Sequence, residues 1–248
     1  MIRKHLILFV LLVVARGLEA QSLAQRVASL GDGTLRLGFA ARAGVCGSRG
    51  GISITSNDDG EWESSCGSGP VRVSLRVSGG RLAAAHTYVG GRWRPVEGPV
   101  SDLGIVSAPA AAADLLALVE QTRGAAEELI TAATLADSAV VWPALLRIAR
   151  GGDLPLETRR QAIFWLGQAA GAAATRGLDS LTTDDRGDLE LRKQAVFALS
   201  QRPADEAVPA LIRVARTNPR RELRRTALFW LGQSEDPRAL AVFEEILR

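Results

Sequence analysis

Apolar and polar residues follow two different spacings along the 248-residue chain, and the change between them divides it into two regions. Over residues 23–100 they alternate in short stretches, for example from Leu35 to Phe39, which is the period of a β-strand. From Asp114 onward the apolar residues recur every three or four positions, which is the period of an amphipathic helix. The spacing therefore predicts a β-rich region followed by a helical one.

Turn residues separate the alternating stretches of the first region. The stretches that follow the one at Leu35 lie at residues 52–55, 61–63, 71–77 and 82–88. Between the first two of these, residues 57–60 end in Asp59-Gly60, which supplies the positive φ angles of a tight hairpin. We therefore expect a small antiparallel β region over residues 21–105.

Helices are predicted in consecutive pairs. The pairs are residues 113–121 with 125–136, 141–150 with 156–168, 174–181 with 189–201, and 207–216 with 220–233, and a last helix at 237–247 opens a further repeat. Asn218-Pro219 and Asp236-Pro237 each place a capping side chain before a proline suited to the first helical position. Residues 106–112, with Pro109 and several alanines, are predicted to link the β region to a helical domain at residues 113–248.

A nine-residue motif occurs three times in the helical region. It reads Arg-Gln-Ala-Ile-Phe-Trp-Leu-Gly-Gln at residues 160–168 and returns with substitutions at residues 193–201 and 225–233. The copies begin 33 and 32 residues apart, a period typical of stacked helical hairpins that bury their apolar faces against each other. We therefore predict an α-solenoid.

The helical region resembles HEAT repeats, and among them the short bacterial kind called PBS-lyase-like HEAT repeats. The resemblance is carried by Asp-Glu-Ala-Val-Pro-Ala-Leu-Ile at 205–212 and by Glu-Leu-Arg-Arg-Thr-Ala-Leu-Phe-Trp-Leu-Gly at 222–232. It covers residues 114–248, with a degenerate first repeat at 113–136 and a Gly-, Thr- and Asp-rich insertion at 169–188 in place of a regular first helix. The resemblance implies a superhelical scaffold that binds partners along its second helices, and no single activity.

The first twenty residues are predicted to be a cleavable secretory signal. Arg3, Lys4 and His5 precede an apolar run of about ten residues, and Leu18-Glu19-Ala20 ends the segment, as in a signal peptide cleaved after a small residue. The run is short for a bilayer span, and an uncleaved anchor is the alternative. We expect a periplasmic or secreted protein with no membrane span after cleavage.

Charge argues against a nucleic-acid partner. The predicted signal holds three of the 30 basic and one of the 27 acidic residues, which leaves 27 and 26 and a net charge of +1. Phosphate binding needs clustered cations without acidic partners. Lys4 and Lys193 are the only lysines beside many arginines, alanines and glycines, which indicates a GC-rich bacterial genome.

Cys46 and Cys66 are the two cysteines of the chain. In an oxidising compartment, an even pair in a small Gly-rich region is most simply a disulfide. Closing its loop of about twenty residues would contribute about 3 kcal/mol. Zinc is disfavoured because the pair and the distant His86 are too few ligands.

Groups suited to catalysis are scarce. His86 is the one histidine after the signal, and most hydrolytic designs need a proton shuttle or a metal. We predict no catalytic residue, no cofactor and no metal; an accessory or lyase-like enzyme with a Cys46–His86 pair is the alternative. Asp184, Asp185 and Asp188 are interpreted as capping the helix that follows rather than as cation ligands.

Each motif copy also carries a cation, a phenylalanine and a glutamine that a solenoid core does not require. Their spacing of i, i+4 and i+8 puts the three on one helix face. We call these nine residues the Arg/Phe/Gln stripe: Arg160, Phe164, Gln168, Lys193, Phe197, Gln201, Arg225, Phe229 and Gln233. The core positions are instead alanines and leucines, such as Ala162 and Leu166.

Two interpretations of the stripe stay open. Its phenylalanines stack on one another between repeats while its cations pair with Glu157, Glu190 and Glu222, or the stripe binds a protein partner. We predict a non-enzymatic, extracytoplasmic protein-binding scaffold that uses the inner face of the solenoid, and we leave its partner and oligomeric state open. A glycan-binding protein of the cell envelope is an alternative, with Trp62 and Trp93 as its aromatic candidates.

Overall fold

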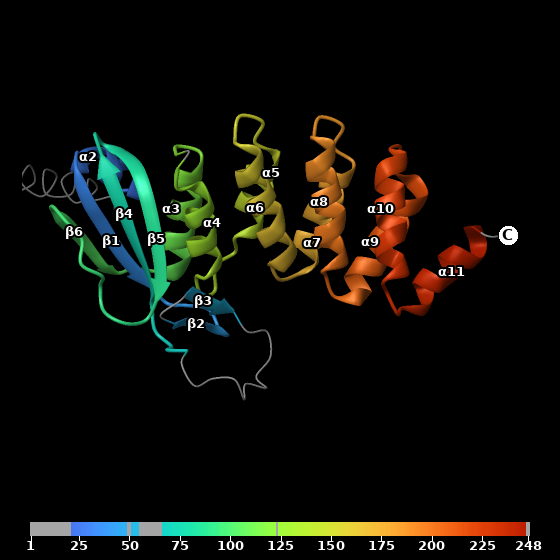
Figure 1. Cartoon of the computed structure of the whole chain (residues 1–248), viewed down its shortest axis with the longest axis horizontal. Coiled ribbons are helices and arrows are strands. Elements are labelled where there is room, and N and C mark those ends of the chain that lie inside the picture. The colour runs from blue at the N-terminus through green and yellow to red at the C-terminus, as the bar shows by residue number, and fades with distance from the viewer. Residues whose placement is uncertain (1–20, 49–50, 55–65, 123, 247–248) are drawn as a thin grey trace, which may run out of the picture.

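The computed structural model describes residues 21–48, 51–54, 66–122 and 124–246 (Figure 1). The predicted signal at residues 1–20, the hairpin turn at 57–60 and Trp62 lie outside these residues. A β sheet lies at one end of the molecule, and helices continue from it in a row toward the C-terminus (Figure 1). The predicted fold class, a small β-rich region followed by an α-solenoid, is confirmed.

The strands of the described residues form two sheets. They are β1 (Gly33–Phe39), β2 (Val45–Ser48), β3 (Gly51–Ile54), β4 (Val71–Ser78), β5 (Arg81–Val89) and β6 (Val100–Ile105). The larger sheet has the order β5-β4-β1-β6, in which β1 is antiparallel to β4 and β4 to β5, whereas β6 is parallel to β1. β2 and β3 form a separate antiparallel pair. The parallel strand β6 makes the larger sheet mixed rather than purely antiparallel.

Alternate residues of β1 and β4 supply the core of the β region. Leu35, Phe39 and Leu75 are almost completely buried, as the alternating pattern predicts. Helix α2 (Leu23–Leu30) packs near this core through Leu23 and Val27. The strand pattern does not predict α2, which has only two buried positions, four residues apart as in one helical turn.

The predicted disulfide between Cys46 and Cys66 is present, with Cα atoms 5.5 Å apart. It joins β2 to the segment before β4, and Gly47 and Gly67 form a backbone bridge beside it. A Cβ on Gly47 would lie 2.2 Å from the carbonyl oxygen of Val89, so only glycine permits this close approach to β5. The disulfide therefore lies beside a tight backbone contact.

Nine helices of the described chain follow β6. They are α3 (Ala108–Val119), α4 (Ala126–Thr134), α5 (Trp142–Arg150), α6 (Leu156–Gln168), α7 (Ala172–Thr182), α8 (Leu189–Ser200), α9 (Ala204–Thr217), α10 (Arg221–Gly232) and α11 (Pro237–Ile246). α6 has the predicted bounds, and the other helices begin and end within five residues of theirs.

The helices pack in two layers, as stacked hairpins do. The first helices α3, α5, α7, α9 and α11 contact one another in turn, and so do the second helices α4, α6, α8 and α10 (Figure 1). The alanines and leucines shared by the motif copies are fully buried: Ala162, Ala195, Ala227, Leu166, Leu199 and Leu231. These buried alanines and leucines therefore hold the stacked hairpins together, as the spacing of 33 and 32 residues between the motif copies predicts.

The boundary between the two regions differs from the linker expected at residues 106–112. α3 already begins at Ala108, with Pro109 in its first turn, where the missing N–H of a proline costs nothing. Ala111 and Ala112 are buried, and one hydrophobic cluster extends from Leu23 to Ala239. The sheet and the first helical pair are thus packed together rather than joined by an exposed segment.

Helix α7 lies in the segment 169–188, where the sequence suggests an insertion instead of a regular first helix. It has eleven residues and covers the helix predicted at residues 174–181, so the polar segment still supplies a first helix to this repeat. The buried guanidinium of Arg192 donates to the carbonyl oxygen of Thr182 through Nε at 3.1 Å and through Nη2 at 2.9 Å. This arginine of α8 therefore holds the end of α7 in place, so that α7 occupies its position in the layer of first helices.

Candidate functional site

The three copies of the Arg/Phe/Gln stripe lie on neighbouring second helices. One copy is on α6, one on α8 and one on α10, and the last glutamine of the second and third copies is the C-cap residue of its helix. Gln168, Gln201 and Gln233 are all exposed. Since α6 contacts α8 and α8 contacts α10, the stripe crosses three adjacent helices.

The phenylalanines of the stripe differ in exposure. Phe164 is 42% exposed and Phe229 59% exposed, whereas Phe197 is half-buried. The Phe197 ring lies 5.1 Å from the ring of Trp230, and Phe164 lies 5.2 Å from Trp165. The ring contacts of these residues therefore join phenylalanine to tryptophan, and the stacking of one phenylalanine on another does not occur.

The middle copy has Ala198 where the other two copies have Trp165 and Trp230, and packing explains the difference. Ala198 is buried against α6, and a Cβ on Gly167 would lie 3.1 Å from the Ala198 Cβ. The backbones of α6 and α8 approach too closely there for a larger side chain.

Two stripe cations pair with glutamates of their own helices, as expected. The Arg160–Glu157 distance is 3.7 Å and the Lys193–Glu190 distance is 2.8 Å. Arg225 is exposed and has no ion pair among the described residues. Exposed pairs of this kind contribute about 0–1 kcal/mol, so the stripe presents weakly held cations beside two exposed phenylalanines.

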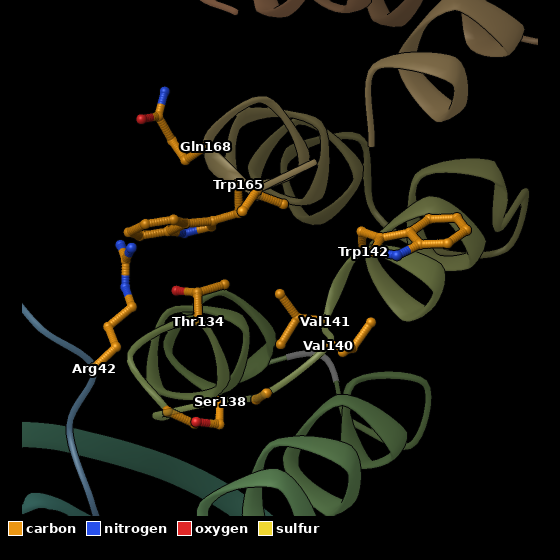
Figure 2. Close-up of a pocket in the computed structure, with 12 residues that line it drawn as sticks. Arg42, Thr134, Ser138, Val140, Val141, Trp142, Trp165 and Gln168 are labelled. Atoms are coloured by element: carbon orange, nitrogen blue, oxygen red, sulfur yellow. The ribbon is translucent and has the colours of Figure 1, made fainter. Parts of the chain in front are cut away.

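A cleft of about 390 Å³ lies beside the first copy of the stripe (Figure 2). It is bordered by the end of α4, the connection from α4 to α5, the end of α6 and the loop after β1. Trp165 and Gln168 contribute from α6, Thr134 from α4, and Trp142 from the start of α5. Arg42 reaches toward the Trp165 ring from the β region (Figure 2).

Backbone hydrogen bonds place Arg42 at the cleft. Its amide donates to the carbonyl oxygen of Leu135 at 2.8 Å, and the amide of Asp137 donates to the carbonyl oxygen of Ala40 at 2.9 Å. These bonds join the loop after β1 to the end of α4. They bring together residues more than a hundred positions apart in the sequence, Arg42 and Trp165.

The cleft contains two buried donors without acceptors. The Nε of Arg42 and the Nε1 of Trp165 have no hydrogen-bond partner, although Trp165 is only 8% exposed. Among the described residues that line the cleft, Arg42 is the one that carries a charge, and burial lowers the pKa of its guanidinium. The sequence analysis did not predict this site. The one feature of the sequence that could have indicated it is the tryptophan at position 165.

The alternative of a Cys46–His86 nucleophile pair is wrong for this structure. Cys46 is bonded to Cys66, so it carries no thiol that His86 could deprotonate. His86 is exposed on β5, opposite Ser74 of β4. The described residues contain no group of three or more His, Cys, Asp or Glu side chains that could hold a metal ion.

The three aspartates before α8 have local structural roles. Asp188 is the N-cap of α8 and accepts from the Glu190 amide at 2.8 Å. Asp185 lies 3.5 Å from Arg192, and Asp184 accepts from a backbone amide two residues later. The helix-capping interpretation is confirmed for Asp188.

Trp93 lies beside arginines of two strands of the larger sheet, β1 and β4. The guanidinium carbons of Arg36 and Arg72 are 5.1 and 5.0 Å from the centre of its ring, and Tyr88 contacts it edge-on at 6.0 Å. Sugar stacking needs a free aromatic face. The arginines therefore compete with a glycan for this ring.

Comparison with known proteins gives one family match. Residues 178–248 match HEAT repeats, a stretch that extends from the second half of α7 through α11. None of the curated proteins matches the chain. The match supports a HEAT-repeat protein, and such helical repeats form scaffolds that often mediate protein interaction. No helix of the described residues is long and apolar enough to cross a membrane.

Proposed function

Starting from the HEAT-repeat match over residues 178–248, we propose that this protein is a non-enzymatic, extracytoplasmic scaffold that binds a protein partner through the Arg/Phe/Gln stripe. The observation that carries this proposal is the exposure of Phe164 and Phe229 on one side of the second helices. Large apolar side chains grouped on a surface are characteristic of interaction sites.

The stripe suits a partner segment that has apolar side chains next to carboxylates. Burying a phenylalanine ring completely contributes about 1.5–3 kcal/mol, and about half of each exposed ring remains available for such burial. Arg225 has no acidic partner among the described residues, and a carboxylate of the partner can replace Glu157 or Glu190 at the other cations. Aromatic residues and arginines often dominate the energy of interfaces.

Phe197 has a supporting role in this proposal. Its ring packs on Trp230 of the following helix, so it positions α10 relative to α8 more than it contacts a partner. The two outer phenylalanines are therefore the ones to change in a binding test.

The test compares the double variant Phe164→Glu/Phe229→Glu with the natural chain. Each protein is crosslinked in a cell envelope, and the captured partners are identified by mass spectrometry. We expect the double variant to lose the captured partner. The introduced glutamates would repel the carboxylates of the partner segment, and they would no longer bury its apolar side chains. Its circular dichroism should stay unchanged because both positions are exposed.

Leu240→Glu is the matched control. Leu240 is 62% exposed on α11, outside the stripe, so this variant introduces the same charge elsewhere and should retain the partner. Capture of the same partner in equal amounts by the double variant and the control would contradict the proposed surface.

The extracytoplasmic location rests on residues 1–20 and on the disulfide. The segment has the composition of a secretory signal, and a disulfide persists in oxidising compartments. Expression in a bacterial host, followed by cell fractionation and N-terminal sequencing, tests the location. We expect an exported protein that begins at Gln21; a cytoplasmic protein with an intact N-terminus would contradict it.

A further inference from the structure

The cleft beside the first copy of the stripe has the size and composition of a small binding site. Its volume of about 390 Å³ falls in the range of about 300–1,000 Å³ that is typical of ligand pockets. Its walls include Val140 and Val141, with several alanines. Such walls accommodate an apolar body, and the polar groups decide what else the ligand must carry.

Two polar groups at one end of the cleft are unpaired donors. Trp165 Nε1 and Arg42 Nε are both buried without an acceptor, and the indole nitrogen lies on the edge of the Trp165 ring that faces Thr134 and Arg42 (Figure 2). An indole N–H and a guanidinium can only donate. The Thr134 hydroxyl already donates to the carbonyl oxygen of Thr131 at 2.7 Å. A ligand that satisfies this end of the cleft must therefore bring acceptors.

The charge of the cleft selects an anion. Of the described residues, Arg42 is the one charged residue that lines the cleft, and none of them offers its guanidinium a carboxylate. A guanidinium remains protonated in proteins, so the half-buried Arg42 places a positive charge at the cleft without a carboxylate beside it. One cation matches a group with a single negative charge better than a phosphate dianion, which would keep one charge unmatched in a largely apolar site.

From these observations we propose that the cleft binds a carboxylate attached to an apolar body. One carboxylate accepts hydrogen bonds from Arg42 and from the indole N–H of Trp165, while the apolar body lies against Val140 and Val141. Free carboxylic acids and the C-terminus of a peptide both offer this chemistry. Gln168 is the one stripe residue among the described residues that line the cleft, and the donors are Arg42 and Trp165, so the site does not depend on the exposed phenylalanines of the proposed function.

The test titrates the full chain, labelled with ¹⁵N, with four probes and follows the indole N–H signals of its tryptophans. The probes are phenylacetate, phenylacetamide, and an N-acetylated tetrapeptide ending in leucine as the free acid and as the amide. We expect at least one acid to bind about tenfold or more tightly than its amide. The Trp165 signal, assigned by its absence in Trp165→Phe, should move with that acid.

Which acid binds identifies the source of the carboxylate. Preference for phenylacetate points to a small acid, and preference for the peptide acid points to a protein C-terminus. Equal binding of acids and amides, tighter binding of inorganic phosphate, or movement of other indole signals without that of Trp165 would overturn the proposal. Failure of both acids to bind would also overturn it.

Two variants remove the donors while they preserve most of the shape of the cleft, and a third variant is the control. Arg42→Met keeps an apolar stem and removes the charge, and Trp165→Phe keeps a ring and removes the N–H. Neither substitution deletes a side-chain hydrogen bond of the described structure, so both proteins should fold. We expect each variant to weaken acid binding about tenfold or more. The control Arg147→Met, which breaks an exposed pair with Glu120 outside the cleft, should bind normally; unchanged binding by Arg42→Met would overturn the assignment.

Discussion

Replacing Arg202 with methionine should destabilise the solenoid more than any exposed arginine substitution. Arg202 lies in the turn between α8 and α9, and it is buried. Its Nη1 donates to the carbonyl oxygens of Gly167 at 3.0 Å and of Ala169, and its Nη2 donates to that of Gly171 at 3.2 Å. One side chain thus satisfies three carbonyl groups at the end of α6 and in the turn from α6 to α7.

The same guanidinium also holds a carboxylate. Arg202 Nη2 lies 2.9 Å from Glu206 Oε2, and its Nε donates to the Thr175 hydroxyl at 2.9 Å. Hydrogen bonds from Thr175 and Arg202 lower the pKa of Glu206. Removing one partner of a buried ion pair costs about 3–5 kcal/mol. Glu206 retains some solvent contact, so we place the loss for Arg202→Met near the lower limit, at about 3 kcal/mol.

Urea unfolding followed by circular dichroism measures this loss, which should lower the midpoint by roughly 1 M or more. The matched control is Arg213→Met, which breaks an exposed ion pair with Asp179 at 2.9 Å and should cost less than about 1 kcal/mol. Hydrogen exchange should show that Arg202→Met opens α7 first, since stacked repeats also unfold locally. Equal stability of the two variants would refute the reasoning.

Further predictions concern the disulfide and the response to acid. Changing both Cys46 and Cys66 to serine should cost about 3 kcal/mol of unfolding free energy for the β region, measured by thermal unfolding; before any substitution, the native protein should show no reactive thiol without reductant. The hydrogen bonds of Arg238 lower the pKa of Asp236 from 3.8 to about 2. Its stabilising effect is therefore complete above pH 4–5 and is lost as the pH falls toward 2. Thermal unfolding from pH 2 to 6 should depend less on pH in Asp236→Asn than in the natural chain; identical profiles would contradict this assignment.

The solenoid was predictable because its repeats are local and similar. Each second helix buries its own alanine and leucine, for example Ala195 and Leu199, at a spacing that needs no knowledge of distant residues. The disulfide was predictable for a related reason, since two cysteines allow one pairing. In both cases the residues that determine the structure lie within one repeat or form a single possible pair.

Contacts between distant segments were not predictable in the same way. The exposed pattern of residues 100–105 gives no sign that β6 pairs in parallel with β1. Arg42 likewise follows a strand in a Gly-rich segment and resembles any exposed arginine in the sequence. Only the hydrogen bonds between its loop and the end of α4 show that it meets Trp165.

The cleft beside the first motif copy follows from the length of α4. α4 has nine residues and α6 has thirteen, so the first second-layer helix is too short to pack along the whole of the next one. Where α6 meets the full-length α8, Ala198 fits closely against Gly167. At the equivalent position of α6 a tryptophan extends over the end of α4, and the loop after β1 covers what remains. The degenerate first repeat therefore does more than begin the stack, because its shortness creates the space in which Arg42 and Trp165 have unpaired donors.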